Sequence, residues 1–265
     1  MIGAKKQVPS RNLGGDHTRV QIDLRDDEFS AGDMAEIAEV TPRIPRAVEA
    51  RLPVLDPSRG LLGADEAQLR VKRMMDFTFA LVAIVLVSPV FLILALTIKV
   101  TSPGPIFYIS DRVGQYGQII KILKFRSMYT DAEYRKAELE EVNEMSGPVF
   151  KMKDDPRITP IGRLIRKLSL DELPQLLHVL TGEMSLVGPR PAIPAEVDTY
   201  DDGERQRLLV KPGLTCIWQV SGRNDVDFDT WMRMDIEYIQ EWTPRLDVAL
   251  LLKTVPAVVL ARGAY

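Results

Sequence analysis

An uninterrupted apolar run at residues 77–98 dominates the pattern of hydrophobic and polar positions along the chain. The run contains no charged side chain, and as a helix it is about 33 Å long, close to the roughly 30 Å hydrocarbon core of a bilayer. Its length predicts one transmembrane helix. However, Ser88-Pro89 lies at its middle, where proline removes a helical hydrogen bond and crowds the preceding turn.

Basic side chains flank the apolar run on both sides: Arg70, Lys72 and Arg73 precede it, and Lys99, Arg112, Lys121, Lys124 and Arg126 follow it. Because Lys and Arg near a membrane segment stay on the cytoplasmic side, both ends are predicted to face the cytoplasm. A helix that breaks at Ser88-Pro89, enters and returns agrees with this distribution. Ser88 is then expected to bond a carbonyl that Pro89 leaves free. From the residues alone, the re-entrant and the spanning helix remain equally open.

Residues 1–70 show no persistent helical or strand period. Pro42, Pro45, Pro53 and Pro57 interrupt any helix that begins there. We therefore expect a mostly disordered extension with a short helix near 65–75, and its pattern indicates no function.

Residues 101–265 alternate short strand patterns with helical ones, which predicts a cytoplasmic domain of the mixed α/β (α+β) class. Strands are expected at 106–109, 118–125, 184–187 and 214–220, and a polar helix at 131–145. The tail at 246–260 is apolar apart from a few polar positions and Pro256. It is typical of an amphipathic helix that lies in the membrane interface.

The clearest helical pattern begins at Thr159, a typical N-cap before Pro160, the favoured first position for proline. Apolar residues then recur at helical spacing in two stripes, and a glycine C-cap follows the second. The stripes are Ile161, Leu164, Ile165 and Leu168, then Leu173, Leu176, Leu177 and Leu180. Because Pro174 cannot lie deep in a helix, the second helix must begin close to Asp171, with Glu172 beside it at the amino-terminal end.

Composition narrows the classes of function. The net charge of −3 argues against a nucleic-acid binder that works by bulk positive charge. Cys216 is the only cysteine, so no intrachain disulfide can form. With His17 and His178 as the only histidines, a Cys/His zinc site is not credible. A single cysteine is typical of a reducing compartment, in agreement with the cytoplasmic face of a membrane.

Asp171 and Glu172 have two interpretations. In the structural one, Ser169 and Glu172 form a capping box and Asp171 complements the helix dipole. In the catalytic one, the carboxylates bind a divalent ion that neutralises a diphosphate, or attack phosphorus to give an acyl phosphate. A helix amino terminus also donates N–H groups to phosphate oxygens. The pair alone does not decide between these interpretations.

Basic side chains near the pair favour the catalytic interpretation, although any one of them also fits a surface charge or a headgroup contact. They are Arg112, Lys124, Arg126, Arg163, Arg166, Lys167 and Arg190. They occupy strand ends, helix edges and turns rather than one solvated run. Arg190 lies between Pro189 and Pro191, which present it stiffly as a planar, bidentate phosphate ligand.

These blocks together resemble the monotopic phosphoglycosyl transferase family, the bacterial sugar transferases that begin polyprenyl-linked glycan assembly. The resemblance covers residues 71–265, nearly three quarters of the chain. It rests on Lys72-Arg73, Ser88-Pro89, Gly104-Pro105-Ile106-Phe107, Arg112-Val113-Gly114, Lys124-Phe125-Arg126-Ser127-Met128, Asp155-Pro156-Arg157-Ile158-Thr159, Leu170-Asp171-Glu172-Leu173-Pro174-Gln175, Gly182-Glu183-Met184-Ser185-Leu186-Val187-Gly188-Pro189-Arg190-Pro191, Pro212-Gly213 and Trp218-Gln219-Val220-Ser221-Gly222-Arg223-Asn224. The ordered set is highly specific, whereas no single block is.

The resemblance implies a monotopic membrane protein of the bacterial inner membrane. Its membrane helix, 71–100, is re-entrant and broken at Ser88-Pro89. Its catalytic domain, 101–265, lies on the cytoplasmic face and ends in the interfacial helix. A role for membrane lipid follows, nucleic acid is not expected as a partner, and a homo-oligomer is left open.

The implied reaction transfers a sugar 1-phosphate from a UDP-sugar to undecaprenyl phosphate. Asp171 is implied to attack the β-phosphorus, release UMP and hold the phosphosugar until the polyprenyl phosphate takes it. Asp171 and Glu172 are implied to hold Mg²⁺, and Arg190 matches the family's phosphate-binding arginine. The other residues expected at the substrates are Arg112, Lys124, Arg126, Arg163, Arg166, Gln219, Arg223 and Asp235, the last with the least defined role.

Two departures from the family pattern affect these expectations. Cys216 stands where the family usually has glycine, which weakens inference about the backbone of that loop. The large forms of the family carry further membrane helices before the catalytic domain, and residues 1–70 have none.

The ending Arg262-Gly263-Ala264-Tyr265 resembles the exopolysaccharide branch, which favours UDP-galactose or UDP-glucose as donor.

Two rival functions are less consistent with the sequence. A non-catalytic membrane-anchored scaffold or regulator that kept the fold would be favoured by loss of Asp171, Glu172 or Arg190, and all three are present. A polytopic transferase without a covalent step requires many membrane spans, and the chain has one short charge-free run.

Overall fold

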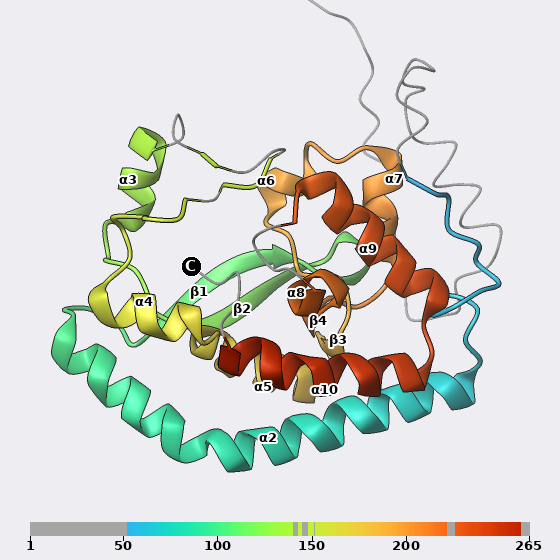
Figure 1. Cartoon of the computed structure of the whole chain (residues 1–265), viewed down its shortest axis with the longest axis horizontal. Helices are drawn as coiled ribbons and strands as arrows, with labels where there is room; N and C mark the ends of the chain where they lie inside the picture. Colours follow the sequence, from blue (N-terminus) through green and yellow to red (C-terminus); the bar gives the residue numbers. More distant parts are fainter. Residues whose placement is uncertain (1–51, 140–142, 145–147, 151, 222–225, 261–265) are drawn as a thin grey trace, which may run out of the picture. The chain divides into compact units, whose positions relative to one another are not determined.

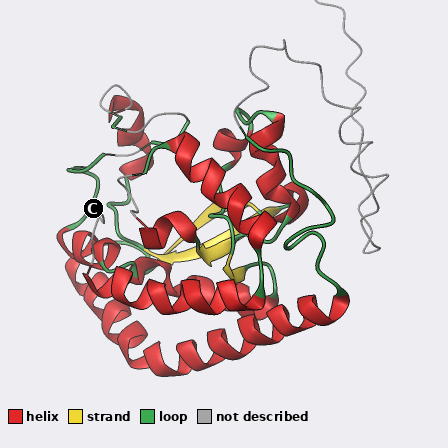
Figure 2. Ribbon diagram, turned by 45° about the vertical axis from the view of Figure 1, so that its right-hand side comes forward, coloured by secondary structure: helices red, strands yellow, loops and turns green. Residues whose placement is uncertain are grey.

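Short β-strands lie at the centre of the fold, and helices surround them (Figures 1 and 2). The computed structural model describes residues 52–260, except for 140–142, 145–147, 151 and 222–225. Its helices are α2 (Glu66–Thr101), α3 (Ala132–Leu139), α4 (Pro160–Lys167), α5 (Leu176–Thr181), α6 (Pro194–Val197), α7 (Asp202–Arg205), α8 (Ile217–Ser221), α9 (Phe228–Glu241) and α10 (Pro244–Leu260). Its strands are β1 (Phe107–Val113), β2 (Ile119–Phe125), β3 (Ser185–Val187) and β4 (Gly213–Thr215), and its 3-10 helices are η1 (Gln115–Gly117), η3 (Leu170–Gln175) and η4 (Gln206–Leu209).

The first sheet is the antiparallel hairpin of β1 and β2. Phe107 lies opposite Phe125 at one end, and Val113 lies opposite Ile119 at the other. Both strands occur where the apolar patterns predicted them, although β1 extends further towards the turn. The polar helix expected at 131–145 is also present but shorter, as α3.

The second sheet is a parallel pair of β3 and β4, with Ser185 opposite Gly213. The backbones approach closely here, because a Cβ added at Gly213 would lie 2.1 Å from the nitrogen of Gly188. The strand expected at 214–220 is wrong beyond β4, since α8 follows directly. The physical reason is that Pro189 comes soon after β3 and has no N–H with which to continue a ladder.

Helix α2 contains the predicted apolar run and continues through Pro89 without interruption. Ser88 Oγ donates a 2.8 Å hydrogen bond to the carbonyl of Val85, the group that Pro89 leaves without its helical donor, as expected. Figure 1 shows that α2 bends along its length. Within the described residues, α2 is the one helix long and apolar enough, by length and composition, to cross a membrane.

One side of α2 contacts the α/β domain along both halves of the helix. Before Ser88-Pro89, Ala80 is fully buried in the main core cluster together with residues of α5, α9 and β3. After it, Leu94 and Ile98 are buried against Phe125 and Ile165. The buried positions recur at helical spacing on both sides of the proline. Both ends of α2 are therefore attached to the same folded domain.

Several of the flanking basic residues are engaged inside the protein instead of serving as free cytoplasmic charges. Lys72 is buried, and its Nζ donates to Asp247 (2.7 Å), to Tyr238 Oη (3.2 Å) and to the carbonyl of Val187 (3.2 Å). Arg73 donates 2.6 Å hydrogen bonds to two carbonyls at the end of α5. These contacts give Lys72 and Arg73 a structural role, and the cytoplasmic orientation of the two ends stays a prediction.

The part of the expected N-terminal extension that the structure describes packs on the domain. Leu55 is buried in the main core, and its N–H donates to Gln206 Oε1 at 2.6 Å. Leu61 donates to the carbonyl of Ile239 in α9 at 2.8 Å. The helix expected near 65–75 is the first part of α2, capped by Asp65. Residues 1–51 and the C-terminal 261–265 lie outside the described residues.

Candidate active site

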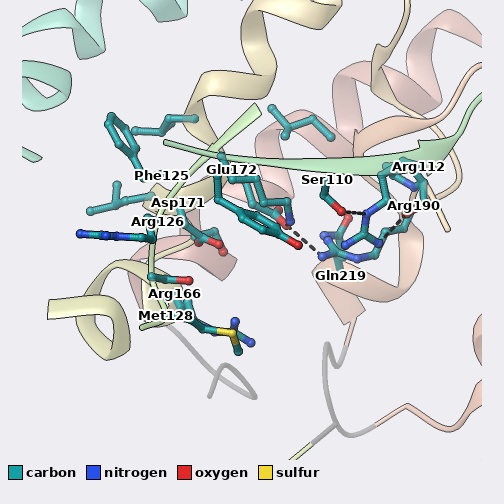
Figure 3. A pocket seen from close by; sticks show the side chains of 18 of the residues that line it. Ser110, Arg112, Phe125, Arg126, Met128, Arg166, Asp171, Glu172, Arg190 and Gln219 are labelled. Atoms are coloured by element: carbon teal, nitrogen blue, oxygen red, sulfur yellow. Dashed lines mark hydrogen bonds and ion pairs between the residues drawn. The ribbon is translucent and has the colours of Figure 1, made fainter. Parts of the chain in front are cut away.

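A cavity of about 1010 Å³ lies beside the β1–β2 hairpin, with walls from η3, β4, α8 and α10. The residues singled out from the sequence that line it are Arg112, Lys124, Arg126, Arg166, Asp171, Glu172, Arg190 and Gln219. Figure 3 shows that Arg112, Arg190 and Gln219 group on one side of the acidic pair, with Arg126 on the opposite side. Segments far apart in sequence therefore meet in one site.

The acidic pair lies in an unusual local structure. Ser169 adopts the left-handed conformation (φ 53°, ψ 23°), and its side chain caps nothing. The 3-10 helix η3 follows with Pro174 inside it, and α5 begins only afterwards. The capping-box interpretation is therefore wrong, because Ser169 lacks the extended N-cap geometry and Glu172 binds elsewhere. By contrast, Thr159 caps α4 as predicted.

Glu172 is held between two cations. Its Oε1 lies 2.8 Å from Lys124 Nζ and 2.9 Å from Arg190 Nη2. Lys124 reaches this position because it follows Ile120 and Ile122 at the strand period of two, on the inner face of β2. Burial opposes ionisation, but Arg190 and Lys124 outweigh it and hold the pKa of Glu172 far below its ordinary value.

Asp171 differs from its neighbour. It is 8% exposed and lines the cavity, and among the described residues its carboxylate has no hydrogen-bond or ion-pair partner. Burial raises its pKa, the negative charge of Glu172 adds to this rise, and Lys124 and Arg166 oppose it. The carboxylate of Glu172 is thus paired with two cations through its Oε1, and the carboxylate of Asp171 is available to a ligand in the cavity.

Arg207 holds the backbone of Arg190 in place. The fully buried Arg207 donates to the carbonyl of Arg190 at 2.7 Å, to Tyr200 Oη at 3.0 Å and to Asp235 at 2.5 Å. Asp235 also accepts from Trp231 Nε1 at 3.1 Å, and burial, only partly offset by Arg207, raises its pKa to about 6. This network fixes the backbone of the Pro-Arg-Pro turn.

The cavity carries more basic than acidic side chains. Burial lowers the pKa of Arg112 and of Lys124, and nearby Arg190 adds to both shifts. Arg166 lines the cavity and its charge opposes the rise in the pKa of Asp171, but among the described residues it has no hydrogen-bond or ion-pair partner. A polyanionic ligand such as a diphosphate would relieve this excess of positive charge.

Some expected substrate-binding residues lie elsewhere or are otherwise engaged. Asp235 does not line the cavity, so we assign it to positioning. Arg163 is exposed on α4 and also lies outside the cavity. Arg126 lines the cavity, but its two terminal nitrogens donate to the carbonyls of Pro103 (2.6 Å) and Ser102 (2.8 Å). Arg223 lies outside the described residues.

Sequence reasoning missed two features of the site. Arg207 was not singled out, because nothing in the neighbouring sequence distinguishes it from the nearby charges Glu204 and Arg205. Asp155 and Arg157 form a buried ion pair at 2.7 Å in the cavity wall, on either side of a proline. In addition, Cys216 Sγ donates to Gln219 Oε1 at 3.0 Å, which orients that carboxamide.

The donor set for a divalent ion is small. Within the described residues no group of three or more His, Cys, Asp or Glu side chains gathers in one place. Asp171 and Glu172 are two hard oxygen ligands, and Glu172 is already shared by two cations. Mg²⁺ is typically held by one or two carboxylates together with substrate phosphates and water. The residues fit Mg²⁺ that arrives with a diphosphate, with Asp171 as the free ligand.

Comparison with known proteins finds related sequences over most of the chain. The bacterial sugar transferase family matches residues 67–261. The exopolysaccharide production protein ExoY of Sinorhizobium fredii is 43% identical over 198 residues, which cover 73% of this chain and 88% of the relative. The undecaprenyl-phosphate galactose phosphotransferase of Salmonella typhimurium (44%) and the UDP-galactose-lipid carrier transferase of Erwinia amylovora (46%) match over 74% of this chain. The matched region spans only 42% of the length of these two relatives.

Proposed function

The chain belongs to the bacterial sugar transferase family, and we propose that it moves a sugar 1-phosphate from a UDP-sugar to undecaprenyl phosphate. It is a membrane-associated phosphoglycosyl transferase of exopolysaccharide production. The observation that carries the proposal is the difference between the two carboxylates: Glu172 is paired with Lys124 and Arg190, whereas Asp171 has no such partner among the described residues and lines a basic cavity.

In the first proposed step, Asp171 forms a bond to the β-phosphorus of the donor and the bond to the bridging oxygen breaks. UMP leaves with that oxygen, and the phosphosugar stays on the carboxylate. Burial supports this role, because it raises the pKa of Asp171 and so strengthens the carboxylate as a nucleophile. We propose that Arg166 and Arg112, which both line the cavity, bind the phosphates.

In the second step, a phosphate oxygen of undecaprenyl phosphate attacks the same phosphorus and displaces the Asp171 carboxylate. The product is the undecaprenyl diphosphate sugar, and the enzyme is restored. Mg²⁺ bound by Asp171 together with the donor phosphates would neutralise the diphosphate. Arg190, held by Arg207, keeps Glu172 and Lys124 in place during both steps.

The donor is proposed to be UDP-galactose or UDP-glucose. Relatives carry names with galactose or glucose, including the UDP-glucose:undecaprenyl-phosphate glucose-1-phosphate transferase of Escherichia coli, which is 37% identical over 204 residues. A panel of UDP-sugars, with purified protein, Mg²⁺ and undecaprenyl phosphate, tests this. We expect UMP release with one or both of these donors and its loss on addition of EDTA. If none of the UDP-sugars in the panel gives UMP release, the proposal is contradicted.

We also propose that α2 dips into the cytoplasmic face of the inner membrane and does not cross it. Both halves of α2 pack on one domain, so a bilayer about 30 Å thick cannot separate its ends. The side of α2 turned away from the domain is apolar and exposed: Phe77, Phe79, Leu81, Val82, Val85, Leu86, Val90, Leu92, Ile93 and Leu96. This side is suited to contact lipid.

Cysteine labelling tests this topology. Arg70→Cys and Lys99→Cys replace exposed residues near the two ends of α2, and Leu86→Cys replaces one at its exposed middle. In intact cells we expect an impermeant maleimide to label none of them. After lysis, both end positions should react and Leu86→Cys should stay protected by lipid. The native Cys216 is buried and serves as the background control. Labelling of either end from outside intact cells overturns the topology.

A further inference from the structure

Helix α10 forms one wall of the cavity that contains Asp171. The side chains that line it are Leu251, Thr254, Ala257 and Val258. The hydroxyl of Thr254 is already engaged, because it donates to the carbonyl of Leu250 at 2.8 Å and lies 2.9 Å from Thr215 Oγ1. This wall therefore offers hydrocarbon to anything that lies against it.

The same cavity has a second apolar lining near the acidic pair. Leu168, Leu170 and Leu173 line it from the end of α4 and from η3, the element that carries Asp171. Basic side chains also line the cavity, among them Arg112, Lys124 and Arg190. The cavity therefore offers both charged and apolar groups to a ligand that reaches Asp171.

An adjacent side of α10 is exposed and apolar. Val248, Leu252 and Val255 are 39%, 69% and 63% exposed, and their spacing places them on one side of the helix. Helix α10 runs alongside α2, whose outer side is also apolar (Figure 1). Helix α10 therefore borders both the cavity and a surface suited to lipid.

We propose that the wall formed by Leu251, Ala257 and Val258 of α10 binds the isoprenoid chain of the acceptor next to its phosphate. The inference rests on the proposed function. A lipid-linked phosphate must reach Asp171 while its chain stays out of water. Helix α10 carries both this wall and the exposed apolar side chains of Leu252 and Val255, so it can accompany the chain from the cavity to the lipid. The donor, which has no long apolar chain, does not need this wall.

The test compares Ala257→Trp, which fills the part of the cavity next to the α10 wall, with Val255→Trp, which adds an indole side chain at an exposed position of α10. Two measurements are made on protein in detergent: the KM for undecaprenyl phosphate, and UMP release in a single turnover without acceptor. We expect Ala257→Trp to raise the acceptor KM about tenfold or more and to leave single-turnover UMP release within about twofold of the unmodified protein. Val255→Trp should change neither.

A second variant, Val258→Gln, makes the wall polar at nearly the same size and should also raise the acceptor KM, in case Ala257→Trp does not fold. An unchanged acceptor KM in the folded variants overturns the inference. The inference is also overturned if single-turnover UMP release falls by the same factor as the acceptor KM rises, because the wall would then serve donor binding or folding. If the unmodified protein transfers no sugar phosphate to undecaprenyl phosphate, the proposed function itself fails, a result that differs from both.

Discussion

Asp171→Asn is expected to abolish transfer, with a loss of turnover of about 10³-fold or more. The amide keeps the shape of the carboxylate but is a poor nucleophile and a poor ligand for a divalent ion. Because Asp171 has no partner among the described residues, the substitution breaks no ion pair. The variant should therefore fold normally and bind the donor while failing in the chemical step.

The decisive measurement is covalent labelling. The unmodified protein, given a UDP-sugar labelled in its β-phosphate and no acceptor, should release about one equivalent of UMP and keep the label after denaturation. The Asp171→Asn variant should do neither. Asp198→Asn, at an exposed site outside the cavity, serves as the matched control and should behave like the unmodified protein. If UMP appears only when both substrates are present and no label attaches, Asp171 is not the nucleophile.

Glu172→Gln is expected to lower turnover about 10²-fold and to destabilise the protein by about 3–5 kcal/mol. The change removes the one negative charge that both Lys124 and Arg190 contact directly. Two buried cations then repel each other and move away from the positions that serve the donor phosphates. Ser169→Ala is the contrasting control, because a capping box would make it costly, whereas Ser169 caps nothing and should tolerate the change.

The pH dependence of unfolding provides an independent measurement for Glu172. Its folded-state pKa lies below the ordinary value of 4.5, because Arg190 and Lys124 outweigh burial. Its contribution to stability is therefore complete above that value and is lost as the pH falls towards the folded-state pKa. The free energy of unfolding of Glu172→Gln should fall less steeply below about pH 4.5 than that of the unmodified protein. Parallel curves would show that the ion pairs do not form in solution.

Local signals predicted the parts of the fold that depend on neighbours in sequence. Thr159-Pro160 starts α4, and the alternation of Ile120 and Ile122 marks β2, because caps and periods act over a few residues. The same local reasoning failed at Ser169, where the motif for a capping box is present but the backbone turns left-handed. The capping-box motif gives no indication that Glu172 instead pairs with Lys124 and Arg190, which lie far away in sequence.

Contacts between residues far apart in sequence explain the remaining differences between the predicted and the observed roles of residues. From the sequence, Lys72 was interpreted as a basic residue flanking a membrane segment. In the structure it pairs with Asp247, which is 175 residues away. Asp235 reads as a substrate residue, yet Arg207 binds it inside the core. Charge pairing of this kind depends on how helices assemble, and one sequence contains no signal of it beyond the charges themselves.

The attachment of α2 has a consequence for the biogenesis of the enzyme. Lys72 neutralises the buried Asp247, and Ala80 completes the main core, so the membrane helix supplies structural parts of the catalytic domain. A chain cut after α2 would leave Asp247 without its countercharge and expose the core surface that α2 covers. Closure of the catalytic core consequently requires α2. A water-soluble form of the enzyme cannot be obtained by removing the helix, and requires polar replacements on its exposed apolar side.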